Sequence, residues 1–246
     1  MRQRSTFDEL DVFISAVESC TDIEQVMILL QGRMNYLGFE KSAYWLRWPY
    51  QENRAPIFLT TYPDSFVGHY IENDYAAYDM VGRLSNNTNR PFGWNEIGQQ
   101  HKISKQQKLI FQDSASVGLR EGASVPIHGP NLAKATFSVA SNLSTQEFKG
   151  LFERHRHEIH ILATAAHEKM MLLGLGSTTS VKELSARETE IILWVARGFS
   201  YSDISDRLLI QEDTVKKHMQ NIFRRLGATN RPHAVSMAII HGLITP

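Results

Sequence analysis

Helix start and stop signals divide about the last 65 residues of this chain at regular intervals. Ser185 followed by Glu188, and Ser200 followed by Asp203, have the spacing of a capping box, in which two side chains satisfy free backbone N–H groups reciprocally. Gly198 lies between the two pairs, and glycine most readily ends a helix in the left-handed conformation. These start and stop signals predict a bundle of short helices at the C-terminal end.

Apolar residues repeat at helical spacing between these signals. The third predicted helix starts near Glu212 and is expected to end at Gly227. Its apolar stripe consists of Val215, Met219, Ile222 and Leu226. Asn230 is expected to cap a fourth helix, with Pro232 tolerated in its first turn. The segment therefore predicts an all-α domain of four helices.

The face of the third helix opposite this stripe is polar and basic. Acidic residues open the helix, where they suit its macrodipole, and cations follow one turn later. Lys can bind guanine acceptors or phosphates, and Gln can pair with adenine through two hydrogen bonds. A solvated helix face carries similar charges, so this face alone leaves both interpretations open. The candidate DNA contacts are Thr214, Lys216, Lys217, Gln220, Asn221 and Arg224.

The segment 182–245 resembles the DNA-binding domain of LuxR-type regulators. The resemblance is carried by L-S-A-R-E-T-E at 184–190, G-F-S-Y-S-D-I-S at 198–205, T-V-K-K-H at 214–218 and R-L-G at 225–227. It implies a helix-turn-helix that places its third helix in the major groove of double-stranded DNA, with a homodimer on a near-palindromic operator. The chain departs from the family at Gln211, where a small capping residue is usual, so we expect a slightly frayed helix start.

Charge and cysteine content narrow the class of protein. Lys and Arg number 17 against 19 Asp and Glu in 1–180, and 9 against 7 in 181–246, so the positive balance lies where DNA phosphates would bind. Cys20 is the only cysteine, which excludes a disulfide framework and a thiolate metal site. No apolar run approaches the ~18 residues of a membrane span, and the N-terminus lacks the apolar core of a signal peptide. We therefore expect a cytoplasmic protein.

Small uncharged residues at 174–181 predict a linker between an N-terminal domain, 1–173, and a C-terminal domain, 182–246. A long helix is expected before it, at about 145–173, and carries four histidines. His157 and His160 could share a turn around a metal ion, yet no cysteine or carboxylate cluster completes a ligand shell. We therefore expect surface or dimer-interface histidines and no metal site.

The N-terminal domain mixes helical and strand patterns. Helices are expected at 7–19, 23–37, 65–74 and 104–117, with Asp22 and Ser104 as caps of the second and fourth. Strands are expected at 42–48, 57–62, 122–128 and 135–141, with a loop at 51–55 and a turn at 129–131. Helices before and after an antiparallel sheet predict an α-β-α sandwich with room for a small ligand, and hence an α+β chain.

Aromatic residues are dense between 62 and 94, and most such clusters simply form a protein core. Asp79 changes this interpretation because it lies beside Tyr78, Met80 and Val81 in an otherwise apolar stretch. A carboxylate buried there must find a hydrogen-bond donor or remain desolvated without compensation. An N–H group of a small ligand is one such donor.

Residues 5–170 resemble the autoinducer-binding domain of LuxR-type quorum-sensing regulators, the receptors for N-acyl-homoserine lactones. The match is carried by Tyr62-Pro63, Tyr70, Asp79, Trp94 and the glycine-led strand at 122–129.

This resemblance implies a role for each matched residue. Asp79 would accept the amide N–H of the signal, Tyr70 would donate to its acyl carbonyl, and Trp94 would pack near the lactone ring. Tyr62 and Ser138 would be secondary contacts. The acyl-chain wall would be Ile110, Phe111 and Leu119. The remaining expected lining residues are Phe66, Val81 and Gly122.

Two departures from the family concern the ligand. Phe66 replaces the tryptophan that donates its indole N–H to the lactone carbonyl. An unpaired buried carbonyl costs about 1–3 kcal/mol, or roughly 5- to 150-fold in affinity. Met80 and Gly82 replace a proline and a valine, so we expect a looser pocket floor. The signal is therefore either a lactone held differently or a molecule without that carbonyl.

The sequence thus indicates a ligand-responsive transcription factor that uses a small-molecule signal and no other cofactor. A response regulator would show a repeated β-α alternation with a phosphoacceptor aspartate, which the N-terminal half lacks. An enzyme would show a nucleophile elbow, phosphate loop or metal triad, and none is present. A regulator of this class that responds to a non-lactone signal, or acts without ligand, remains the alternative.

Overall fold

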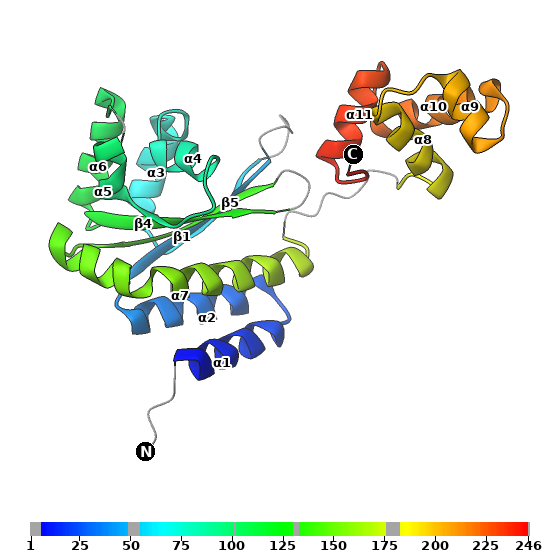
Figure 1. The fold of residues 1–246 in the computed structure, drawn as a ribbon. Helices are drawn as coiled ribbons and strands as arrows, with labels where there is room; N and C mark the ends of the chain where they lie inside the picture. The colour runs from blue at the N-terminus through cyan, green and yellow to red at the C-terminus, as the bar shows by residue number, and fades with distance from the viewer. Residues whose placement is uncertain (1–5, 49–54, 101, 130–132, 176–182, 246) are drawn as a thin grey trace. The chain divides into compact units, whose positions relative to one another are not determined.

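The computed structural model describes residues 6–48, 55–100, 102–129, 133–175 and 183–245 (Figure 1). The chain divides into two compact units. One contains the sheet and the helices up to residue 175, and the other contains the four C-terminal helices.

The N-terminal unit mixes helices and strands in the order expected of an α+β domain. Its elements are α1 (Thr6–Glu18), α2 (Ile23–Leu37), β1 (Lys41–Arg47), β2 (Ile57–Thr60), α3 (Asp64–Glu72), the 3₁₀ turn η1 (Tyr75–Ala77), α4 (Met80–Ser85), β3 (Phe92–Gly93), α5 (Trp94–Gln100), α6 (Lys105–Ser116), β4 (Glu121–His128), β5 (Lys134–Ser141) and α7 (Thr145–Leu172).

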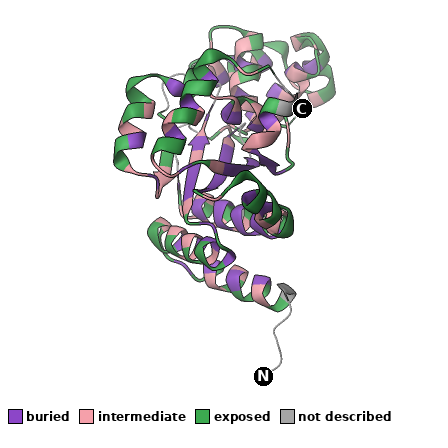
Figure 2. Cartoon of the chain, turned by 90° about the vertical axis from the view of Figure 1, so that its left-hand side faces the viewer, coloured by how far each residue is buried: buried purple, intermediate pink, exposed green. Residues whose placement is uncertain are grey.

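An antiparallel sheet with the order β2-β1-β5-β4-β3 forms the middle layer. Helices α1, α2 and α7 cover one face, and α3 to α6 cover the other (Figure 1). Residues on β1, β4 and β5 are mostly buried between these layers (Figure 2). The predicted α-β-α sandwich is therefore confirmed.

Strand register brings two rows of side chains to the face covered by α3 to α6. In one row Trp45 pairs with Phe58 on β2 and with Thr136 on β5. In the next row, two residues away along each strand, Ala43 pairs with Ser138, and Ser138 pairs with Ser124. Because side chains alternate between faces with a period of two residues, both rows point to the same side of the sheet. We call them the bulky row and the small row.

On the opposite face, a partly buried group of ion pairs joins the three helices. Arg33 of α2 bonds to Glu9 of α1 at 2.7 Å and to Glu158 of α7 at 2.5 Å. His155 lies within 3.0 Å of the same Glu158 carboxylate. These contacts connect the three helices behind the sheet.

Local capping explains why most helix ends could be predicted from the sequence. The side chains of Asp22 and Ser104 accept the backbone N–H groups of Gln25 and Gln107, as predicted. The elements without a prediction are the short ones, η1, α4, β3 and α5. These have at most seven residues, too few for a hydrophobic period to show.

The C-terminal unit contains the four predicted helices, α8 (Ala186–Ala196), α9 (Tyr201–Leu208), α10 (Glu212–Leu226) and α11 (Arg231–Ile240). Both predicted capping boxes form, at Ser185 and Ser200. Gln211 makes no side-chain capping bond, in keeping with its departure from the family pattern. The core is built from the predicted stripe of α10 together with apolar residues of α8, α9 and α11.

Part of the predicted linker lies outside the described residues, namely 176–181. Gly174 has a φ of 88° and, with Leu175, caps the end of α7 through hydrogen bonds to Met171 and Met170. The domain boundaries stay a prediction. Among the described helices, none is both long and apolar enough to cross a membrane.

Candidate functional sites: an aromatic cavity and a basic helix

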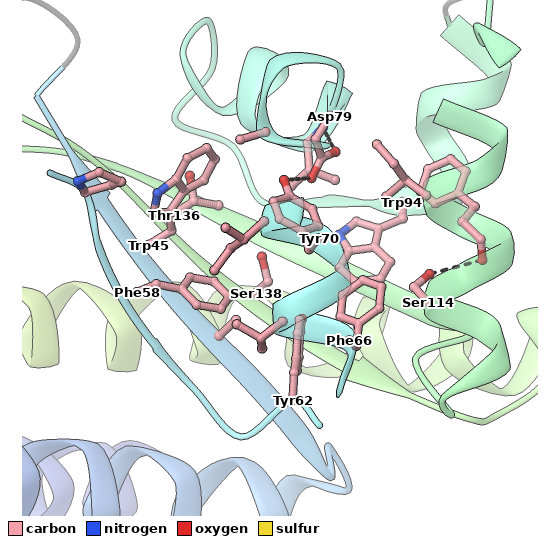
Figure 3. A pocket seen from close by; sticks show the side chains of 18 of the residues that line it. Trp45, Phe58, Tyr62, Phe66, Tyr70, Asp79, Trp94, Ser114, Thr136 and Ser138 are labelled. Carbon is pink, nitrogen blue, oxygen red and sulfur yellow. Dashed lines mark hydrogen bonds between the residues drawn. The ribbon is translucent and has the colours of Figure 1, made fainter. Parts of the chain in front are cut away.

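The two sheet rows form the floor of a cavity whose other walls are α3, η1, α4, α5 and α6. Its volume is about 350 Å³, near the lower end of the ~300–1,000 Å³ typical of small-molecule sites. Aromatic rings dominate the wall (Figure 3). The lining residues are Ala43, Trp45, Pro56, Phe58, Tyr62, Phe66, Val67, Tyr70, Ile71, Asp74, Ala76, Asp79, Val81, Trp94, Ile110, Phe111, Ser114, Thr136 and Ser138.

Asp79 places a carboxylate in this aromatic wall, at the start of α4. One oxygen, Oδ1, accepts the backbone N–H of Val81 at 2.9 Å and so caps the helix. The other, Oδ2, accepts the hydroxyl of Tyr70 at 3.0 Å (Figure 3). Burial raises the pKa of Asp79, while these two hydrogen bonds oppose the increase. The carboxylate is therefore held in place and retains a lone pair for a ligand N–H.

Two polar side chains near Asp79 favour its ionised form. Arg47 interacts electrostatically with the carboxylate while its guanidinium bonds to the Gly82 carbonyl at 2.7 Å and to Asn86 Oδ1 at 2.5 Å. Gln107 accepts the backbone N–H of Met80 at 2.6 Å, and its side-chain amide, beside the Asp79 carboxylate, lowers the pKa of Asp79. The site is thus anchored from β1, α4 and α6.

Tyr62 has a buried hydroxyl with no hydrogen-bond partner among the described residues. Burial first, and the negative charge of Asp79 second, raise the pKa of Tyr62. A neutral hydroxyl without a partner, in the wall of a cavity, is a donor available to a ligand carbonyl. Tyr70 differs, because its hydroxyl already donates to Asp79.

Trp94 starts a chain of hydrogen bonds that ends at the cavity. Its indole Nε1–H donates to Ser124 Oγ at 3.0 Å, and Ser124 Oγ lies 2.8 Å from Ser138 Oγ. Because the indole can only donate, Ser124 is free to donate to Ser138, which leaves the Ser138 hydroxyl hydrogen for a ligand. Gly122 makes this arrangement possible, since a β-carbon there would lie 2.6 Å from the Trp94 ring.

Phe66 lines the cavity between Tyr62 and Tyr70, with ring centroids 6.3 and 6.1 Å away. It is 8% exposed and offers no hydrogen-bond donor. The cavity wall therefore lacks a hydrogen-bond donor at Phe66, where the family has a tryptophan.

Nine of the eleven predicted ligand residues line the cavity. Leu119 and Gly122 do not: Leu119 packs in the core with Tyr62 and Phe66, and Gly122 supports Trp94 from behind. Ile110 and Phe111 line the cavity from α6. Phe111 and Trp94 pack on the same small core of Val81, Phe92 and Ile97.

The bulky-row residues Trp45, Phe58 and Thr136 also line the cavity, although no sequence pattern indicated them. Their common side is set by strand register, which local patterns do not specify. Gly82, one of the two residues behind the expected looser floor, lies close to Trp45. A β-carbon on Gly82 would lie 2.9 Å from Trp45 Cζ3, so the indole already fills the space that a valine side chain would take.

The second candidate site is the polar face of α10. Lys216, Lys217, Gln220 and Arg224 are exposed, and Thr214 and Asn221 are half-buried beside them. Lys216 forms ion pairs with Glu212 at 3.0 Å and with Asp213 at 3.3 Å, which raise its pKa. Arg224 bonds to Asn221 at 3.2 Å.

Arg225, next in sequence, has a structural role. It bonds to the Glu183 carbonyl at 2.6 Å and lies 3.5 Å from the Glu188 carboxylate. Among the described residues, no group of three or more His, Cys, Asp or Glu side chains gathers as a metal site would require.

Two family models match the chain. "Autoinducer binding domain" matches residues 22–170, and "Bacterial regulatory proteins, luxR family" matches residues 182–238. These are families of transcriptional regulators and not of enzymes.

Similar proteins extend over most of the chain. The putative HTH-type transcriptional regulator y4qH of Sinorhizobium fredii is 31% identical over 187 residues, which are 76% of this chain and 56% of that relative, so the chain spans little more than half of it. Transcriptional activator protein BjaR1 of Bradyrhizobium diazoefficiens is 26% identical over 235 residues, 95% of each chain.

A crystal structure of Escherichia coli SdiA has a similar fold, with a TM-score of 0.83 and 23% identity over 98% of this chain and 100% of that one. An α-β-α domain with an aromatic cavity thus precedes a helix-turn-helix, and both match known families. The chain belongs to the LuxR family of regulators, which combine an autoinducer-binding domain with a DNA-binding domain.

Proposed function

We propose that this regulator senses an N-acyl-homoserine lactone or a close amide analogue. The single observation that carries the proposal is the Asp79 carboxylate, held by Tyr70 and Val81 in an aromatic cavity of about 350 Å³. A carboxylate in such a wall is well satisfied by a ligand N–H, because its burial among apolar groups disfavours the unpaired charge. An acyl amide has that N–H next to a carbonyl.

The neighbouring hydroxyls match an amide carbonyl. Tyr62 has a hydroxyl without a partner among the described residues, and Ser138 ends the chain of hydrogen bonds from Trp94. Both can donate to the acyl carbonyl without breaking a bond, whereas Tyr70 would first have to leave Asp79. We therefore assign the carbonyl to Tyr62 and Ser138, and give Tyr70 the role of orienting the carboxylate.

The lactone ring would occupy the end lined by Trp94, Ile110 and Phe111. Phe66 supplies a flat apolar surface there but no donor to the ring carbonyl. The missing hydrogen-bond donor at Phe66 supports the alternative function, a response to an acyl amide without a lactone. The volume of the cavity argues against the second alternative, a regulator whose pocket is filled by its own side chains.

Asp79→Asn tests the proposal with little change in shape. Asparagine caps helices as well as aspartate does, so Oδ1 keeps the Val81 N–H, while an NH₂ group replaces the acceptor Oδ2. We expect a loss of about 2–3 kcal/mol in ligand binding, or roughly 30- to 140-fold. Titration of the full chain with acyl-homoserine lactones measures it. Asp11→Asn, the same change at an exposed site on α1, is the matched control.

Wild-type affinity in Asp79→Asn would contradict the proposed role of this carboxylate. No binding of any lactone by the wild type would contradict the lactone assignment and leave the amide alternative, to be tested with the same acyl groups on simple amides.

We propose further that two copies bind a near-palindromic operator in the cytoplasm, each with α10 in the major groove. The exposed cations of α10 support DNA contact, and Ile161 and Leu172, exposed on α7 at 45% and 79%, support association of copies. Half-sites should then lie about one helical turn apart. A change of about 5 base pairs in the half-site spacing should abolish binding in a gel-shift assay. Sedimentation of the full chain should give the mass of a dimer.

A further inference from the structure

Trp45 stands at the end of the cavity away from Trp94, where the acyl group of the proposed ligand would lie. Figure 3 shows Trp45, Phe58 and Thr136 together at this end, with Trp94 and Phe66 at the other. Register explains the grouping, because Trp45 pairs directly with Phe58 and with Thr136 across the sheet. The bulky row is thus the wall that a ligand meets after its amide has bonded to Asp79.

The indole of Trp45 is held in one position before any ligand binds. The guanidinium of Arg47 lies over the ring, 4.8 Å from its centroid. Hydrogen bonds to the Gly82 carbonyl and to Asn86 fix that guanidinium in turn. Gly82 allows the ring to lie directly against the backbone of α4, since a β-carbon would lie 2.9 Å from Cζ3. Cation–π contact and close packing therefore hold the ring.

The free side of this ring lies towards the small row. Ala43, Trp45 and Arg47 alternate onto the same face of β1. Arg47 covers the indole from one side, and Ala43, on the other side, is too small to cover it. The exposed indole surface is therefore part of the cavity, as its place in the lining indicates.

The cavity reaches solvent beside the bulky row. Phe58 is 43% exposed and Ile71 is 70% exposed, and both line the cavity, which therefore opens between β2 and α3. A long straight acyl chain would pass Trp45 and continue into water at this opening. Its added methylene groups would gain little burial and hence little affinity.

The geometry points to Trp45 as the residue that selects the acyl group, and to an arylacyl group as the class it selects. A flat ring gains stacking on the fixed indole and edge contact with Phe58, and it ends before the opening. A preorganised surface of this kind favours rigid ligands, because little side-chain ordering is left to oppose binding. The inference rests on the proposed acyl-amide function, and it adds the class of acyl group.

The test is a titration of the full chain with phenylacetyl-, butanoyl- and dodecanoyl-homoserine lactone. We expect the phenylacetyl compound to bind most tightly to the wild type. Trp45→Leu should weaken it by roughly 2- to 12-fold through lost stacking and should improve binding of the dodecanoyl compound. Trp45→Phe keeps a flat ring and should retain the preference for phenylacetyl, which separates stacking from a general loss of folding.

Gly82→Ala is a second, independent perturbation. The added methyl group pushes on the indole without touching the ligand and suits a helix better than glycine, so folding should be preserved. We expect phenylacetyl binding to fall by roughly 5-fold or more, with a smaller change for the butanoyl compound because its chain has no ring to stack on the indole.

Dodecanoyl binding equal to or tighter than phenylacetyl binding in the wild type would overturn the inference, as would an unchanged preference in Trp45→Leu. If no lactone binds, the lactone assignment fails, and the pair N-methylphenylacetamide and N-methyldodecanamide decides the acyl selectivity. Preference for the aryl amide, lost in Trp45→Leu, supports the role of Trp45. Equal binding or no binding of the two amides overturns it.

Discussion

Gly122→Ala is the substitution whose effect the structure defines most sharply. The new β-carbon would lie 2.6 Å from three atoms of the Trp94 ring, whereas carbon atoms in contact normally lie ~3.5–4.0 Å apart. The ring must therefore move by roughly an ångström, which breaks its 3.0 Å hydrogen bond to Ser124. Overpacking costs about 1–3 kcal/mol and the lost bond about 1 kcal/mol. We expect a loss of about 2–4 kcal/mol in the free energy of unfolding, together with weaker ligand binding.

Gly150→Ala provides the control. Gly150 lies within α7, and a β-carbon added there would have no atom within 4 Å beyond the neighbouring backbone of its own helix. Alanine should therefore stabilise the helix by about 0.5–1 kcal/mol. Hydrogen exchange of β4 and β5 in the full chain, followed against urea, gives the unfolding free energy of this domain alone. The reasoning is refuted if Gly122→Ala is as stable as the wild type and binds ligand equally well.

Three further predictions concern the cavity, the polar face of α10 and a buried histidine. Phe66→Trp should increase sensitivity to ordinary acyl-lactones by restoring the donor, whereas for a signal without the lactone carbonyl it should crowd the site; a dose-response panel on both proteins distinguishes the two outcomes. Lys216→Ala and Gln220→Ala should relax base preference, and Lys217→Ala should weaken binding to all DNA and lower the salt slope by about one; gel shifts that show unchanged operator affinity for Lys216→Ala and Gln220→Ala would refute this recognition face. The Tyr44 hydroxyl lies 2.6 Å from His167 Nδ1, and burial lowers the pKa of His167 to about 4. The unfolded chain then binds more protons between pH 4 and 6.5, so stability contributed by the neutral ring is complete above pH 6.5 and falls by roughly 2–4 kcal/mol towards pH 4. Urea titrations across this range should show a smaller decrease for His167→Gln than for the wild type.

Features set by local chemistry were predictable from the sequence. The caps at Asp22, Ser104, Ser185 and Ser200 depend on residues three positions apart, and the structure contains all four. Asp79 was identifiable for a related reason, because one carboxylate in an apolar stretch needs a partner wherever the chain folds.

Features set by pairing between distant strands were not predictable. Trp45 reaches the cavity because β1 pairs in one register with both β2 and β5, and a shift by one residue would turn it to the other face. Leu119 and Gly122 are the converse case, because the sequence predicted them to line the cavity and they do not. Leu119 lies in the core instead, and Gly122 lies behind Trp94.

The small row and the bulky row would contact different parts of the proposed ligand, although they lie on one face of the sheet. Ala43 and Ser138 lie under the amide of the proposed ligand, whereas Trp45 and Phe58 meet its acyl end, only two residues further along each strand. Substitutions in the bulky row can therefore change the accepted signal without altering amide binding, strand register or the core behind the sheet. Such a receptor can diverge towards new signals by single substitutions while its fold and its DNA-binding domain stay the same.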